Sequence, residues 1–154
     1  MNTIDDIHVQ RLGKKDFHLL EPLNYAIFKE ARVINRTDHD TLVILMAMHG
    51  DVPVGFKIGY NRRNGVFYSA KGGVLPQYRR KGVAAKMLGR MILEADKLGF
   101  KKFIYDTFPN MNPGMLILGL NSGFKVIEAK YNAQYKDFQV SLEKELSPDY
   151  SRIN

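Results

Sequence analysis

Apolar residues recur along the chain with two different spacings, and the switches between them predict its elements. Seven segments alternate apolar and polar residues or run as short apolar stretches, which is typical of strands. They cover residues 7–12, 42–48, 52–60, 66–75, 101–107, 124–131 and 137–144. Asn64-Gly65 separates two of these segments, and this dipeptide predicts a tight hairpin turn. The second, third and fourth strands are therefore expected to form an antiparallel meander.

Three segments show helical spacing instead. The clearest is 82–98, where apolar residues fall on one face and Gly99 ends the pattern. A second covers 16–31, in which Pro22 either kinks the helix or marks its true first turn. The third is 111–121.

The resulting order is β-α-β-β-β-α-β-α-β-β. The strand–helix–strand unit at 66–107 needs a right-handed crossover, so its two strands are expected to be parallel neighbours. The order therefore predicts an α+β fold with a mixed, mostly antiparallel sheet of about seven strands and helices on both faces. A polar loop is expected at 33–41, and a frayed tail at 147–154.

Composition fits one globular domain over residues 1–154, since the chain is 45% hydrophobic and 25% charged. Cysteine is absent, which excludes thiol nucleophiles and Cys-ligated metals. The four histidines are scattered, and no metal site is predicted. We expect a cytoplasmic protein without a membrane interaction, because neither a signal peptide nor a membrane-length apolar run is present.

Positive charge is concentrated in one stretch. The net charge is +7, and residues 79–102 hold eight basic and two acidic side chains. Such a patch suits one localised polyanion at least as well as a nucleic-acid duplex. The nucleic-acid alternative ranks lower, because only Tyr78 and Phe100 offer aromatic rings near the basic residues.

The same stretch contains a strand, a basic loop and a helix start. The strand runs out at Pro76, and the helix begins near Gly82. Unpaired N–H groups and the positive end of the dipole make a helix N-terminus an anion site. Gly82 would let the backbone approach a phosphate closely, and Ala84 leaves the next turn unobstructed. The loop side chains Arg79, Arg80 and Lys81 would add mobile charge at the rim, so a pyrophosphate fits this segment.

These residues carry a resemblance to a known family. Residues 79–84, RRKGVA, resemble the [Q/R]xxGx[G/A] acyl-CoA motif of the GNAT superfamily of N-acetyltransferases. The preceding VxPxYR at 74–79 and the later NSGF at 121–124 resemble that family as well. The likeness extends from about residue 7 to about residue 146 and implies the acyl-CoA N-acyltransferase fold.

The resemblance implies that acetyl-CoA is bound where two strands splay apart, with backbone groups near Val74 and Leu75 pairing with pantetheine. One of their N–H groups would polarise the thioester carbonyl. It further implies that an Asn at the start of the third helix contacts the cofactor, and Asn110 and Asn112 both qualify. The pyrophosphate would be held by the backbone of the motif and the helix start, namely Arg80, Lys81, Gly82, Val83, Ala84 and Ala85.

The chain departs from the family at two catalytic positions. Many members carry a proton-donating Tyr seven residues after the Asn, but those positions here are Gly119 or Ile117. Tyr105 or Tyr131 could serve instead, or the thiolate could leave unassisted. Many members also place a Glu on the central strand as a general base, and that strand has none. The carboxylates that could act as the base are Glu30, Asp106 and Glu128.

The function predicted is therefore an acetyl-CoA-dependent N-acetyltransferase in which the amine attacks the thioester directly, with both substrates bound together. A non-catalytic acyl-CoA sensor remains the alternative, because both usual catalytic side chains are missing. The acceptor amine stays open, although acidic residues in 16–41 favour a cationic small molecule. Many relatives dimerise, so the resemblance leaves a homodimer open.

Overall fold

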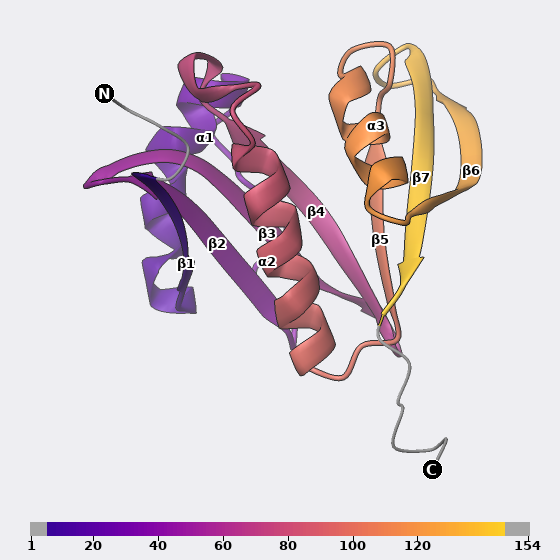
Figure 1. Cartoon of the computed structure of the whole chain (residues 1–154), viewed down its shortest axis with the longest axis horizontal. Coiled ribbons are helices and arrows are strands. Elements are labelled where there is room, and N and C mark those ends of the chain that lie inside the picture. Colours follow the sequence, from indigo (N-terminus) through magenta and orange to yellow (C-terminus); the bar gives the residue numbers. More distant parts are fainter. Residues whose placement is uncertain (1–5, 147–154) are drawn as a thin grey trace.

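The computed structural model describes residues 6–146. Within this range the strands form one seven-stranded sheet in the order β1-β2-β3-β4-β5-β7-β6 (Figure 1). Their bounds are β1 Ile7–Leu12, β2 Leu42–His49, β3 Val52–Arg63, β4 Val66–Val74, β5 Lys102–Thr107, β6 Lys125–Asn132 and β7 Asp137–Glu145. The predicted element order and mixed sheet are confirmed, whereas the predicted tail at 147–154 lies outside the described residues.

The pairing follows the prediction as well. The hairpin between β3 and β4 turns at Asn64-Gly65, where Gly65 has φ +76°. All neighbouring strands are antiparallel except β4 and β5, which pair in parallel from Val66 opposite Lys102 to Ser69 opposite Tyr105. A helical crossover joins the two parallel strands. Beyond the paired residues Ser69 and Tyr105, β4 and β5 diverge (Figure 1).

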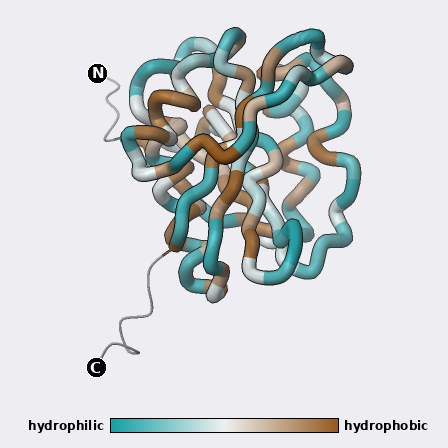
Figure 2. Tube along the Cα trace, turned by 90° about the vertical axis from the view of Figure 1, so that its right-hand side faces the viewer, coloured by the Kyte–Doolittle hydropathy of each residue, from teal (hydrophilic) through white to brown (hydrophobic). Residues whose placement is uncertain are grey.

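Helices cover both faces of the sheet, as predicted (Figure 1). α1 (Leu20–Phe28) packs on one face, which we call the α1 face. α2 (Val83–Lys97) and α3 (Pro113–Asn121) lie on the opposite face, the α2 face. Side chains alternate between the faces along each strand. The α1 face buries Ile44, Met46, Phe56 and Ile58, and the α2 face buries Val43, Leu45, Phe67, Phe103 and Leu142. Figure 2 shows hydrophobic segments along the interior strands and hydrophilic ones in the peripheral connections.

Two predicted helices are shorter than expected. A 3-10 helix, η2 (Lys14–Leu19), precedes α1, so Pro22 lies in the first turn of the α-helix and does not kink it. α3 begins at Pro113 because a residue before proline avoids the helical region, and Asn112 accordingly has φ −142°. Among the described helices, none is long and apolar enough to span a membrane.

Several basic side chains of the 79–102 stretch bind the protein itself. Lys86 Nζ donates to the carbonyl of Ile7 at 3.0 Å, and Arg90 Nη1 donates to that of Val9 at 2.9 Å. Both carbonyls belong to β1, the edge strand of the sheet. These contacts cover an otherwise unpaired strand edge. Part of the basic charge is thus used inside the fold.

Candidate functional site

The parallel strands part immediately after Ser69 and Tyr105, and we call the opening beyond this pair the splay. A register shift against β3 occurs here, because Ile58 pairs with Lys71 while Gly59 pairs with Ser69. Ala70 is therefore an extra, bulged residue, and such a bulge bends the strand that carries it. The bulge turns β4 away from β5 and opens the sheet.

Gly72 and Gly73 follow shortly after the bulge, and both allow neighbouring side chains to approach the strand closely. A Cβ on Gly73 would lie 2.9 Å from side-chain carbons of both Ile27 and Phe28, so glycine there lets α1 sit directly on β4. Gly72 points to the opposite face and is exposed to solvent within the splay.

One backbone group of β4 is directed into the splay. The amide of Leu75 donates to the carbonyl of Val54 on β3 at 2.8 Å, so it faces away from the splay. Hydrogen-bonding direction alternates along a strand, and the amide of Val74 therefore faces the splay. Of the two residues expected to offer backbone N–H groups, the structure directs Val74 into the opening and Leu75 away from it.

The loop after β4 ends in a helix start that is open for an anion. Arg80 and Gly82 both have left-handed backbones, with φ of 60° and 83°. Within residues 6–146, no side chain caps the N-terminus of α2, and its first turn contains no acid. The first amides, those of Val83, Ala84 and Ala85, have no partner within the helix. The exposed side chains of Arg80 and Lys81 flank them.

Arg79 differs from its predicted role as mobile charge. Its Nε donates to the carbonyl of Val74 at 3.1 Å and ties the loop to the end of β4. A second tie, missed in the sequence, is a 2.7 Å hydrogen bond between the Tyr78 hydroxyl and Nδ1 of His49 on β2. The Lys81 ammonium lies 5.6 Å from the centre of the Tyr78 ring. The loop is therefore held in place from two sides.

A carboxylate lies at the apex of the splay on the α1 face. Asp106 follows directly after the last paired residue of β5 and accepts hydrogen bonds from the hydroxyls of Tyr68 (2.8 Å) and Ser141. Burial and the Asp106 charge raise the pKa of the Tyr68 hydroxyl above its usual range, so Tyr68 stays a donor. The two hydroxyls hold the Asp106 carboxylate in one orientation.

Glu30 lies on the same face, over β4. Its carboxylate pairs with the ammonium of Lys71 at 2.9 Å, and its side chain remains 55% exposed. The buried amide of Asn24 donates to the Glu30 carbonyl at 2.7 Å and fixes the end of α1. The ammonium of Lys71 also lies 4.6 Å from the centre of the Phe28 ring. Glu30 thus lies beside β4 and is held in an ion pair with Lys71.

The other side chains predicted as a possible acid or base either lie far from the splay or are directed away from it. Glu128 and Tyr131 lie on β6, which β7 separates from β5, and both are exposed. Tyr105 is at the splay, but its hydroxyl donates to the carbonyl of Met115 on α3 at 2.6 Å. Burial raises the pKa of Tyr105 to about 12. Its hydroxyl is therefore turned toward α3 and is a weak acid.

The structure separates the two asparagine candidates. The Asn110 amide donates to the Asp137 carboxylate at 2.9 Å. Its side chain therefore connects the loop between β5 and α3 to the start of β7. Asn112 occupies the N-cap of α3, yet within the described part of the chain its side chain makes no capping hydrogen bond. Asn112 is the one with an amide left for a ligand.

Lys57 was missed by the sequence analysis. It lies on β3 opposite Gly72, on the α2 face, and is only 6% exposed. Its ammonium lies 6.0 Å from the centre of the Tyr105 ring. Burial lowers the pKa of Lys57 to about 8. The only sequence signal was one lysine within the apolar run of residues 52–60, which a half-exposed strand would also show.

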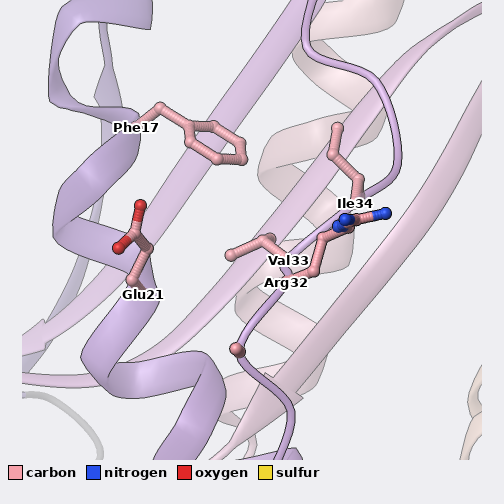
Figure 3. A pocket seen from close by; sticks show the side chains of 6 residues that line it. Phe17, Glu21, Arg32, Val33 and Ile34 are labelled. Carbon is pink, nitrogen blue, oxygen red and sulfur yellow. The ribbon is translucent and has the colours of Figure 1, made fainter.

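A hollow of about 320 Å³ lies on the α1 side (Figure 3). Phe17 and Glu21 line one wall, while the segment 31–34 lines the other (Figure 3). Lys71 Nζ on β4 donates to the carbonyl of Arg32 at 3.4 Å, so the segment that lines the hollow also contacts β4. Across residues 6–146, no three His, Asp or Glu side chains converge in a way that could hold a metal ion.

Comparison with known proteins agrees with this geometry. Residues 7–118 match the acetyltransferase (GNAT) family model. A search of curated proteins gave no match. Among solved structures, an IAA acetyltransferase from Bacillus cereus is similar, with TM-score 0.76, 18% identity, and coverage of 91% of this chain and 99% of the other.

Two further structures show the same fold. One is the ribosomal-protein-S18-alanine N-acetyltransferase from Escherichia coli, with TM-score 0.75, 12% identity, and coverage of 92% of this chain and 95% of the other. The other is yncA from Salmonella typhimurium, solved with its cofactor acetyl-CoA, with TM-score 0.71, 17% identity, and coverage of 92% and 95%. At these identities, the likeness shows the fold.

Proposed function

Because the chain belongs to the GNAT family of acetyltransferases, we propose that it is an N-acetyltransferase that moves the acetyl group of acetyl-CoA to a primary amine. The amine would attack directly, with both substrates bound together. The observation that carries the proposal is the splay between β4 and β5, with an inward amide at Val74 and the open N-terminus of α2 close behind it.

The residues present fit acetyl-CoA. Its pyrophosphate would be held by the amides of Val83, Ala84 and Ala85, with the charges of Arg80 and Lys81 at the rim. These donors are uncapped among the described residues, and a helix start free of acids favours an anion. The loop is fixed by its ties to Val74 and His49, so little ordering is needed on binding.

Val74 and Asn112 would hold the middle of the ligand. When bound, acetyl-CoA supplies an activated acetyl group. The Val74 amide would donate a hydrogen bond to its carbonyl oxygen, where negative charge develops. The Asn112 side chain, without a capping hydrogen bond in the described chain, would contact the pantetheine arm.

Asp106 is the carboxylate best placed to accept the proton of the amine. An amine is mostly protonated near neutral pH, so a base must take its proton before attack. Asp106 lies at the apex of the splay with its orientation fixed by Tyr68 and Ser141. Glu30 is paired with Lys71, and Glu128 lies two strands away, so Glu30 would serve to attract the acceptor.

The sensor and nucleic-acid alternatives make different predictions for one experiment. Purified protein is titrated with acetyl-CoA and then given a panel of primary amines, from polyamines to amino acids and a lysine peptide, while release of the free thiol is followed. Thiol release that depends on the amine, with intersecting initial-rate lines, supports the proposal. Binding without release for any amine would favour the sensor. Absence of acetyl-CoA binding would overturn both.

A further inference from the structure

Lys57 spans the strand that forms one side of the splay. From β3, its side chain runs along the α2 face over Gly72, whose Cβ position lies 3.2 Å from Lys57 Cγ. Its ammonium then reaches the Tyr105 ring, the last β5 residue paired with β4. The charge therefore sits where the two strands part.

This charge has no counter-ion among the described residues. Lys57 as a whole is 6% exposed, and within residues 6–146 no hydrogen bond or ion pair holds its ammonium, which is nevertheless not fully enclosed. The Tyr105 ring, at 6.0 Å, is at the outer limit of a cation–π contact. A buried, unpaired charge costs free energy, and an apolar side chain at this position would avoid that cost. A partner from outside the chain would account for the lysine.

We propose that the Lys57 ammonium is the proton donor for the sulfur that leaves during acetyl transfer. The inference rests on the proposed function, because it assigns a group to the same site. It fills the position that the chain leaves open, since Gly119 and Ile117 have no proton to give and the Tyr105 hydroxyl donates to Met115.

The step balances in atoms and electrons. The amine nitrogen bonds to the acetyl carbon, and the carbon–sulfur bond breaks with its electron pair passing to sulfur. An Nζ–H bond of Lys57 breaks as the S–H bond forms, leaving a neutral amine and a neutral thiol. The base takes the proton of the attacking amine, and water returns a proton to Lys57.

The Lys57 ammonium and the thiol that would receive its proton have similar pKa values. Burial lowers the pKa of Lys57 to about 8, close to that of a free thiol at about 8.5. The groups facing Lys57 impose no charge on it. Its neighbours across β2 and β4 are Leu45 and Gly72, and α2 presents apolar side chains to this face, namely Val83, Met87, Leu88 and Met91. From β5 it faces Tyr105. The buried acid of α2, Glu94, is paired with Arg90 on the same helix and with Arg11 on the edge strand β1.

The test compares ligands that differ only in sulfur. Wild type, Lys57→Met, Lys57→Arg and the exposed-lysine control Lys97→Met are titrated with CoA and with desulfo-CoA at pH values below, near and well above the pKa of Lys57, and transfer rates are measured with the same proteins. We expect wild type to prefer CoA over desulfo-CoA most strongly near the pKa of Lys57, where the ammonium and the thiolate coexist, and less at higher pH, where Lys57 loses its proton. Lys57→Met should lose roughly tenfold of that preference while binding desulfo-CoA normally. Its transfer rate should fall about 100-fold.

Lys57→Arg separates charge from proton transfer. Arginine keeps the charge but does not release its proton, so we expect a retained preference for CoA with a lowered transfer rate. An unchanged preference and an unchanged rate in Lys57→Met would overturn the inference. If wild type itself binds no acetyl-CoA, the proposed function fails instead. Lys57→Met should also unfold at a higher temperature than wild type, whereas a lysine with a structural role would lower that temperature.

Discussion

The hydroxyl of Tyr105 occupies the space that a side chain at position 119 would need. A Cβ added to Gly119 would overlap the Tyr105 hydroxyl oxygen and lie 2.9 Å from Leu142 Cδ2. α3 therefore packs on β5 through a glycine, and the Tyr105 hydroxyl binds the Met115 carbonyl beneath it. A larger residue at position 119 would have to displace the Tyr105 side chain, so packing disfavours a tyrosine at that position.

Gly119→Ala should destabilise the protein by about 1–3 kcal/mol, because the added methyl group overpacks the α3–β5 contact. Tyr105→Phe should remove most of that penalty, so the double variant should lose less stability than the two single changes added together. Chemical denaturation measures all four proteins. Gly89→Ala is the matched control: nothing lies within 4 Å of its Cβ position in α2, and it should stabilise by about 0.5–1 kcal/mol. Additive losses would contradict this account.

Lys57→Met should stabilise the fold near neutral pH. Burial lowers the pKa of Lys57 from 10.5 to about 8. Between these values the unfolded chain binds more protons than the folded chain, so the lysine's penalty is complete below pH 8 and fades as pH rises toward 10.5. The shift corresponds to about 3 kcal/mol. The advantage of Lys57→Met in free energy of unfolding should therefore shrink over this range. A constant difference, or a less stable variant, would contradict it.

Asp106→Asn should lower the transfer rate by about 100-fold, because the base is lost while the side chain keeps its size. The affinity for acetyl-CoA should not change, since Asp106 lies on the α1 face and the anion site follows β4. Initial rates and calorimetry check the two parts. Asp51→Asn, in an exposed turn, is the control. A larger loss of rate in Glu30→Gln or Glu128→Gln would assign the base elsewhere.

Asn112→Ala and Asn110→Ala form a matched pair. Asn112 has an amide without a capping hydrogen bond in the described structure, whereas that of Asn110 binds Asp137. We expect Asn112→Ala to weaken acetyl-CoA binding by roughly tenfold, the equivalent of one hydrogen bond. Asn110→Ala should leave binding almost unchanged. The reverse order of affinities in calorimetry would show that the assignment is inverted.

The fold could be predicted because its elements are encoded locally. The apolar spacing of each strand, the Asn64-Gly65 turn and the start of α2 at Gly82 each depend on neighbouring residues alone. The bulge at Ala70 is not encoded in this way, because it is defined by the pairing of β4 with β3, and Gly73 serves the approach of α1, a contact between distant segments.

The candidate site was only partly predictable for the same reason. The proposed anion loop is one continuous segment, so its residues could be predicted from the sequence. Lys57 was not predicted, because its role depends on burial on the α2 face of the sheet and on its position near Tyr105, which lies on another strand. Arg79 likewise appeared as free charge, since its bond to the Val74 carbonyl depends on how the loop folds back.

The central claim is that the start of α2 binds the pyrophosphate of acetyl-CoA, and calorimetry on Ala85→Glu tests it most directly. Ala85 is exposed in the first turn of α2. A glutamate at this position would stabilise the helix through its interaction with the helix dipole, but it would repel a bound phosphate. We predict a variant at least as heat-stable as wild type that has lost acetyl-CoA binding, while Ala85→Gln of equal size still binds. Equal acetyl-CoA affinity in wild type and Ala85→Glu would contradict the account.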